Sequence, residues 1–114
     1  MRAEALATEV ANGKGLGLEI AYHDVFRHCE NAPEAVVHLG RALDAEGVPW
    51  DRGDLPMRPS EDFGHFGDKA AAAMFFLGAG ETHPSLHNPD YDFPDDLIGI
   101  GARVFMRTLR NMLG

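Results

Sequence analysis

The sequence has one cysteine, few positive charges and no long apolar segment. The single cysteine excludes an intrachain disulfide and is typical of a reducing compartment. Asp and Glu number 18 against 10 Lys and Arg, so the net charge is -8 and no basic patch for nucleic acid is present. The longest apolar run, residues 70–77, is too short to cross a bilayer, and the N-terminal MRAEALATEV lacks the apolar core of a signal peptide. We therefore expect a cytoplasmic protein that binds neither nucleic acid nor membrane.

The remaining composition is that of an ordinary globular chain. Of its 114 residues, 45% are hydrophobic and 25% are charged, a balance that indicates one domain's worth of sequence with a modest core. No internal repeat and no low-complexity linker divides it.

The most informative stretch runs from Ala70 to Phe93. Its first part, AAAAMFFL, carries no charge and predicts a strand buried on both faces. The strand breaks at Gly78-Ala79-Gly80 and gives way to a polar loop. That loop carries two histidines and two aspartates: His83, His87, Asp90 and Asp92. A buried strand that delivers such side chains to one edge of a sheet is a common way to build a site in an α/β protein.

Four helices and a second strand are expected around this stretch. Residues 2–11 favour a helix, and the alternation over Leu16–Tyr22 predicts a half-buried strand. Asn31 is predicted to cap a helix that stops at Gly47. A short helix capped by Ser60 follows the Pro- and Gly-rich residues 48–59. The last helix starts near Asp95, and its expected buried seam is Ile98, Ala102, Phe105, Leu109 and Met112.

The candidate site residues each have two interpretations. The segment SEDF at residues 60–63 is interpreted first as a capped short helix with Phe63 and Phe66 packed inward, and alternatively as part of a catalytic site. Two loop histidines such as His83 and His87 are more often surface residues than metal ligands. Adjacent His28 and Cys29 fit no zinc spacing and indicate a connector.

Three segments in this order resemble the C-terminal end of a known enzyme family. They are SEDF at 60–63, MFFLGAG at 74–80 and LHNPDYDF at 86–93, followed by an amphipathic helix. The family is the zinc-dependent amidohydrolases, the group of metallopeptidases that contains aminoacylase, hippurate hydrolase and indole-acetyl-amino-acid hydrolase. The resemblance is specific from Pro56 onward and looser toward the first helix.

The resemblance implies a fold and a set of site residues. The fold would be α/β, part of a three-layer sheet-and-helix catalytic domain over residues 31–114. Residues 1–30 would be the last helix and strand of the ferredoxin-like lid domain, which serves in dimerisation, together with a connector. In that family His87 would bind one metal of a dinuclear site. Ser60, Glu61, Asp62 and Phe63 would line the active site.

The family's other ligands do not occur in this sequence. They belong to a His-x-Cys-Gly-His-Asp motif, a Glu-Glu pair that includes the general base, and a further histidine. The chain therefore resembles the last quarter to third of such an enzyme. Complete members hold zinc or another divalent metal and cleave the amide of N-acyl amino acids or small peptides. We expect this chain to bind no metal alone and to have no catalytic residue of its own.

Two further hypotheses concern partners. In the first, the chain self-associates as a homo-oligomer, since its apolar strand needs neighbours. In the second, it is a binding module that completes a separately encoded upstream half. A site assembled across several copies from His87, His83 and acidic residues is the third possibility.

Overall fold

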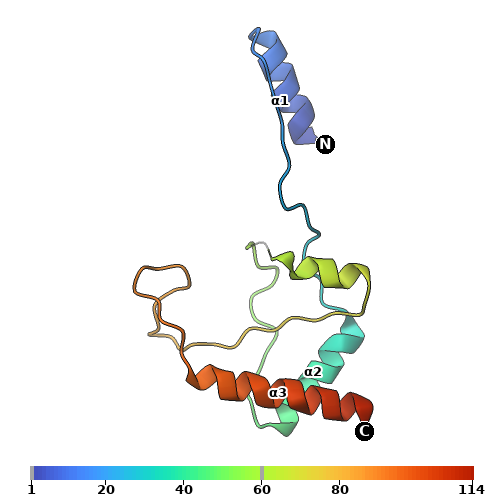
Figure 1. The fold of residues 1–114 in the computed structure, drawn as a ribbon, viewed down its shortest axis with the longest axis vertical. Helices are drawn as coiled ribbons and strands as arrows, with labels where there is room; N and C mark the ends of the chain where they lie inside the picture. The colour runs from blue at the N-terminus through green and yellow to red at the C-terminus, as the bar shows by residue number, and fades with distance from the viewer. Residues whose placement is uncertain (1, 60) are drawn as a thin grey trace.

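Four helical segments carry the regular structure of this chain. The computed structural model describes residues 2–59 and 61–114, and within these ranges it contains no β-strand (Figure 1). The elements are α1 (Arg2–Gly13), α2 (Pro33–Ala45), the 3-10 helix η1 (Asp62–Asp68) and α3 (Asp96–Leu113). The predicted helices are thus confirmed, because the propensities and end signals that specify them are local in sequence. No helix of the described residues is long and apolar enough to cross a membrane.

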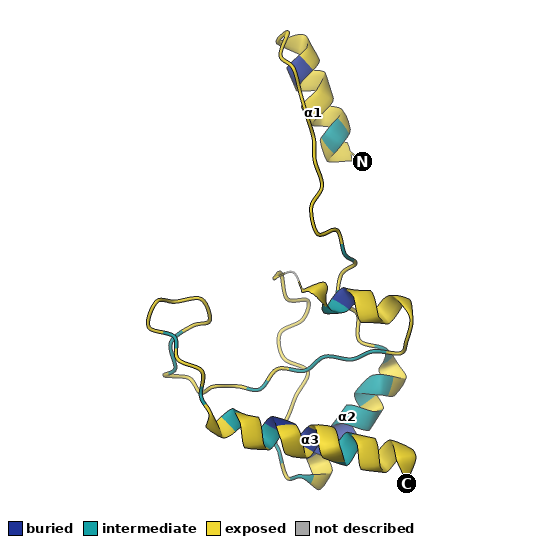
Figure 2. Cartoon of the chain, viewed as in Figure 1, coloured by how far each residue is buried: buried dark blue, intermediate teal, exposed yellow. Residues whose placement is uncertain are grey.

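The core lies where α2 crosses α3. Ala42 and Leu43 of α2 and Val104 of α3 are buried, and Val48 and Phe75 pack against them. Figure 2 shows how little else is covered, since most of the ribbon is coloured as exposed. So small a buried cluster supplies only a few kcal/mol of hydrophobic stabilisation, at about 1.5–3 kcal/mol for each large side chain.

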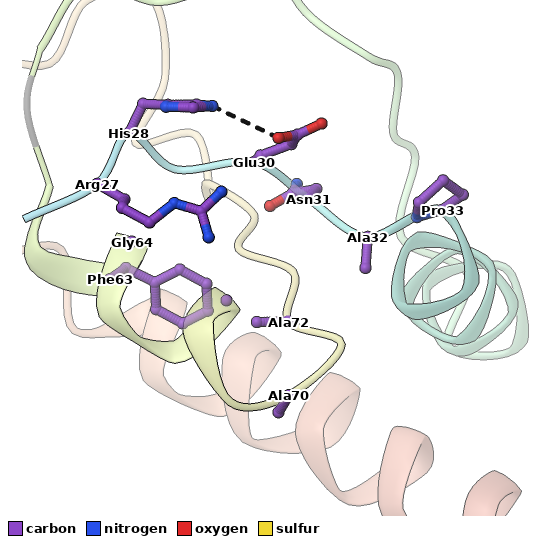
Figure 3. A pocket seen from close by; sticks show the side chains of 11 residues that line it. Arg27, His28, Glu30, Asn31, Ala32, Pro33, Phe63, Gly64, Ala70 and Ala72 are labelled. Carbon is purple, nitrogen blue, oxygen red and sulfur yellow. Dashed lines mark ion pairs between the residues drawn. The ribbon is translucent and has the colours of Figure 1, made fainter.

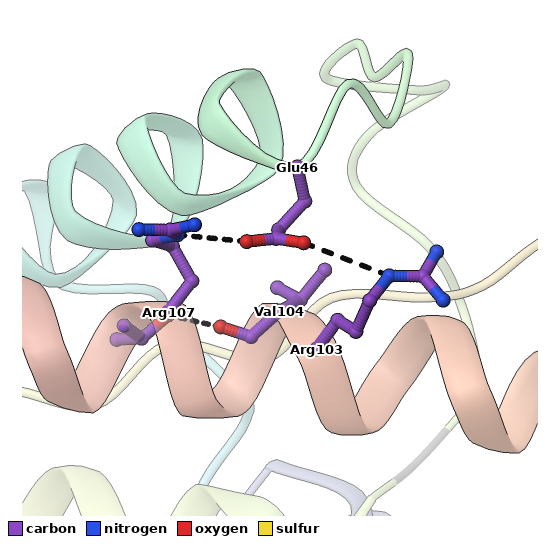
Figure 4. A network of polar contacts seen from close by, with 5 residues as sticks. Glu46, Arg103, Val104 and Arg107 are labelled. Atoms are coloured by element: carbon purple, nitrogen blue, oxygen red, sulfur yellow. Dashed lines mark hydrogen bonds and ion pairs between the residues drawn. The ribbon is translucent and has the colours of Figure 1, made fainter.

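A carboxylate at the end of α2 reinforces this crossing. Glu46 accepts a hydrogen bond from Nε of Arg107 at 2.7 Å and lies 3.6 Å from Nε of Arg103. Figure 4 shows Glu46 between the two arginines, above Val104. The carboxylate is 15% exposed while the arginines are 38% and 56% exposed, so solvent screening limits the pair with Arg107 to about 1 kcal/mol.

The predicted α/β fold is wrong for the described residues, because residues 70–77 are extended but form no sheet. Their hydrogen-bond partners on one edge are the Asn31 side chain and the Ala32 backbone. The Asn31 amide donates to the Met74 carbonyl at 2.8 Å and accepts from the Met74 N–H at 2.9 Å, and Ala32 N–H donates to the Ala72 carbonyl at 2.8 Å. A strand is defined by hydrogen bonds to a neighbouring strand. Here the amide side chain of Asn31 bonds to the backbone of one residue, Met74, instead.

Asn31 also corrects the prediction for the start of α2. The N-cap residue is Ala32, and no side chain caps the helix. Both hydrogen-bonding functions of the Asn31 amide are used on Met74 instead, so the long-range contact replaces the local one.

The predicted strand over Leu16–Tyr22 is also wrong. This segment is extended and exposed, and Figure 1 shows it running back along α1, which lies far from the other helices. Its attachments to α1 are a hydrogen bond from Leu16 N–H to the Ala11 carbonyl at 2.9 Å and one from the Tyr22 hydroxyl to the Glu4 carboxylate. No ferredoxin-like sheet is present in the described residues, because no second strand lies beside this segment.

The buried seam predicted for α3 is solvent-exposed. The buried residues of α3 are Gly101 and Val104, and the predicted seam of Ile98, Ala102, Phe105, Leu109 and Met112 lies open. The described residues form no sheet that this seam could pack against. Phe66 of η1, expected to pack inward, is 62% exposed for the same reason. The radius of gyration is 20.0 Å, whereas a compact chain of this length has about 13 Å.

Asn31→Asp tests whether Asn31 pairs with Met74 or caps α2. Aspartate is as good an N-cap as asparagine, so a capping role predicts no loss of stability. Pairing with Met74 predicts a loss of about 1 kcal/mol, because a carboxylate cannot donate to the Met74 carbonyl. Urea denaturation followed by circular dichroism measures the difference, and an unchanged midpoint would contradict the pairing.

The Tyr22 hydroxyl reports the attachment of residues 16–22 to α1. Its hydrogen bond to Glu4 raises the pKa of Tyr22 above the usual value. The raised pKa means that the attachment is favoured while Tyr22 is protonated and is lost as the pH rises through that pKa. In a Tyr91→Phe variant, which leaves Tyr22 as the remaining tyrosine, ultraviolet titration should give a midpoint above about 10. Adding Glu4→Gln should lower it to the usual value; no difference between the two variants would refute the contact.

Candidate functional site

The structure places the two predicted groups of site residues in different parts of the molecule. The segment Glu61–Phe63 forms the start of η1, and Ser60 lies outside the described residues. Figure 1 shows the loop that precedes α3, which carries His87, projecting away from η1. The sequence predicted that these groups share one site, and in the described residues they do not meet.

Three contacts hold η1 against residues 27–30. Gly64 is buried, and a Cβ at this position would lie 2.0 Å from the Arg27 carbonyl oxygen. Arg27 donates to the Asp68 carboxylate at 2.8 Å, a contact that raises the pKa of the Arg27 guanidinium. The Cys29 thiol donates to the Glu61 carbonyl at 3.7 Å. The start of η1 is therefore positioned by residues 27–30, for which the sequence indicated only a connector.

A cavity of about 190 Å³ lies between these segments (Figure 3). Its walls come from residues 27–33, from η1 and from the start of the 70–77 segment. They are Arg27, His28, Glu30, Asn31, Ala32, Pro33, Phe63, Gly64, Gly67, Ala70 and Ala72. The His28 Nε2 lies 3.4 Å from the Glu30 carboxylate, and both side chains are 74% exposed. Charges so accessible to water lack the desolvation that prepares an acid or base for catalysis.

Glu61, Asp62 and Phe63 differ in their exposure. The two acids are exposed, and neither side chain caps η1. Phe63 is half-buried, lines the cavity and stacks on Phe66 with ring centroids 5.1 Å apart. The interpretation of 60–63 as the start of a short helix is confirmed for Glu61–Phe63. The lining role of these residues in an active site remains a prediction.

His87 lies in a pair of consecutive turns. Asn88 N–H donates to the Ser85 carbonyl, and Tyr91 N–H donates to the Asn88 carbonyl, each at 3.0 Å. His87 has a φ of 71°, a left-handed conformation that is uncommon for a residue with a Cβ. Its side chain is exposed, as are those of Asp90 and Asp92. The turns thus hold an imidazole at the surface of a projecting loop.

His83 has a structural role in the same loop. Its Nδ1 lies 3.0 Å from the Pro84 carbonyl oxygen, and its ring meets the Tyr91 ring edge-on at 5.2 Å. These contacts agree with the interpretation of His83 as a loop residue rather than a ligand.

The donor set does not make a metal centre by itself. A catalytic zinc site takes three protein ligands. In residues 2–59 and 61–114, no group of three His, Cys, Asp or Glu side chains is placed to hold a metal ion. His87 is exposed, and the described residues by themselves do not fit a dinuclear centre.

Sequence reasoning missed the residues that organise this region. Gly64, Arg27 and Asp68 fix η1, and Asn31 fixes the neighbouring 70–77 segment. One signal was available for Gly64, because a glycine inside a short helical pattern often marks a close backbone approach. The Arg27–Asp68 pair spans 41 positions of sequence and left no local signal.

A comparison with models of protein families gave a match. The model of peptidase family M20/M25/M40 matches residues 9–111. No curated protein and no solved structure matches the chain.

Two glycines of η1 provide a matched test of its position. Gly64→Ala places a Cβ on the Arg27 backbone and should cost about 1–3 kcal/mol, whereas a Cβ at Gly67 meets nothing within 4 Å. Cys29, the only cysteine, contacts Glu61, so its thiol should react faster with a labelling reagent in Gly64→Ala than in wild type. Equal labelling rates in Gly64→Ala and Gly67→Ala would contradict the close approach.

Proposed function

This chain belongs to peptidase family M20/M25/M40, and we propose that it supplies part of a metal-dependent amidohydrolase site rather than a complete one. The family match over residues 9–111 supports a metallopeptidase origin. One observation carries the proposal. His87 is exposed on a loop, and the described residues place no group of His, Cys, Asp or Glu side chains around it that could hold a metal ion.

In this proposal His87 is a ligand for zinc or another divalent metal. Its imidazole offers a nitrogen of the kind that zinc prefers, and the two turns around it fix the backbone that carries it. The other metal ligands and the general base are supplied by the upstream part of the enzyme, as the resemblance to the aminoacylase and hippurate hydrolase group implies. We therefore assign the chain alone no hydrolytic step.

The substrate class follows from the same resemblance. The complete site would cleave the amide of an N-acyl amino acid or a small peptide. Glu61, Asp62 and Phe63 at the start of η1, together with Ser60, would line that site once the His87 loop and η1 come together. Residues 31–114 would belong to the catalytic domain and residues 1–30 to the lid domain, in a cytoplasmic protein.

A second candidate function is a non-catalytic module that self-associates. It is supported by the large apolar side chains left exposed on α3 and on the 70–77 segment, among them Ile98 at 59% and Phe76 at 66%. Large apolar side chains are usually covered in a folded protein, and a patch of them that stays exposed marks an interaction site.

Reconstitution tests the first candidate. The purified chain is mixed with zinc and with the upstream part of a family member that carries His-x-Cys-Gly-His-Asp and the Glu-Glu pair, and hydrolysis of N-benzoylglycine is measured. We expect activity only in the mixture. His87→Ala should lower it by about 100-fold or more, because a metal ligand is lost.

His83→Ala is the matched control and should retain the reconstituted activity, since His83 contacts Pro84 and Tyr91. Three results would contradict the proposal: hydrolysis by the chain alone, reconstituted activity that survives His87→Ala, or no binding between the two parts.

A further inference from the structure

The outer face of α3 carries a continuous apolar seam. Its residues follow one another at alternating spacings of four and three, which is the heptad spacing of helices that pack side by side. All of them are exposed, and the four large ones are each at least half exposed: Ile98, Ala102, Phe105, Leu109 and Met112. Figure 2 shows most of α3 coloured as exposed. The face with Gly101 and Val104 is the one that meets Leu77 and α2.

Charged side chains follow the seam along one flank. Asp96, Arg103 and Arg110 recur at intervals of seven residues, so all three lie at the same position beside the seam. Among the described residues Asp96 and Arg110 have no ion-pair partner, whereas Arg103 lies 3.6 Å from Glu46. An open groove of about 340 Å³ lies on this charged flank, lined by Glu46, Ala102, Arg103, Met106, Arg107 and Arg110.

We propose that α3 packs against α3 of a second copy of the chain, antiparallel, about a two-fold axis level with residues 103 and 104. The inference rests on the self-associating candidate function and names the surface responsible. In this register Ala102 lies opposite Phe105 of the second copy, and Ile98 lies opposite its Leu109. The small side chain of Ala102 leaves room for the large ring of Phe105, and the two-fold axis repeats both contacts.

The covered flank of α3 selects the antiparallel direction. On the side of the seam away from the charged flank, Gly101 is buried and Thr108 is half-buried. In a parallel pair, the charged flank of one helix would have to meet this covered flank of the other. A two-fold axis perpendicular to the helices instead brings the two charged flanks together, and both are exposed.

Charge complementarity selects a second copy as the partner. Asp96 lies beside Arg110 of the second copy, offset by one residue, or about 1.5 Å along the helix axis, and the two-fold axis makes this contact twice. Arg103 of both copies lies near the axis, where Glu46 of the same chain offsets each positive charge. Each chain carries a net charge of -8, so most of its surface repels a second copy. The charged flank is complementary to itself when the helices run antiparallel.

A pair of leucine variants tests the seam. Leu109→Lys places a charge at the proposed interface, and Leu6→Lys, the matched control, changes an exposed leucine of α1. Sedimentation velocity over a range of concentrations should show reversible dimers for wild type and Leu6→Lys. The dissociation constant of Leu109→Lys should rise by about 10-fold or more, because its charge would be buried without a partner. Circular dichroism of both variants verifies that the helices remain.

A mixture of two charge variants tests the direction. Arg110→Asp alone sets two aspartates against each other across the interface, and Asp96→Arg alone sets two arginines against each other, so each variant should dimerise more weakly than wild type. In an equimolar mixture both contacts regain opposite charges. Sedimentation velocity should therefore show more dimer in the mixture than in either variant alone.

Three results would overturn the proposal: a wild-type chain that stays monomeric, a dimer that Leu109→Lys weakens no more than Leu6→Lys, or a mixture without rescue. The reconstitution assay stays separate. If the upstream part binds and restores activity while wild type alone remains monomeric, the pairing of α3 fails and the amidohydrolase proposal stands. If the dimer passes both tests and reconstitution fails, the pairing stands without the amidohydrolase proposal.

Discussion

The Asn31 amide and the backbone of Met74 form two of the three described hydrogen bonds between residues 27–32 and residues 70–77. They attach the connector at residues 27–32 to the extended segment 70–77. The connector in turn holds η1 through the Arg27–Asp68 pair, and the extended segment reaches α3 through Phe75. Without this amide, the described contacts between the connector and residues 70–77 reduce to the single bond from Ala32 to Ala72 and the packing of nearby side chains.

This arrangement leaves more apolar surface than the chain can cover. The buried cluster consists of Ala42, Leu43 and Val104, while the outer face of α3 and the apolar side chain of Phe76 remain open. Family membership gives this surface a physical meaning. The sequence carries apolar patterns suited to additional layers of structure, and the described residues supply no element to form them. The proposed self-association and the proposed completion of a metallopeptidase site are alternative ways to cover that surface.

Prediction from sequence succeeded where the determinants are local and failed where they are not. Pro33 and Glu34 at the start of α2 and the acids before α3 mark helix ends that the structure confirms. The prediction of a strand at residues 70–77 was wrong. An apolar run indicates burial, but the hydrogen-bond ladder of a strand depends on a neighbouring strand far away in the sequence. Asn31 satisfied every rule for an N-cap and bonds to Met74 instead, since the long-range partner uses both of its polar functions. The surface position of His87 depends on turns that sequence rules locate poorly, and its role as a ligand stays a prediction.

The central claim is that the isolated chain leaves its apolar faces uncovered, because its described segments make few contacts with one another. Small-angle X-ray scattering of wild type, extrapolated to dilution where a single copy dominates, tests it most directly. The account predicts a radius of gyration near the 20.0 Å of this structure. A value near about 13 Å, that of a compact globule of the same length, would show that the chain buries its own apolar surface and would contradict the account.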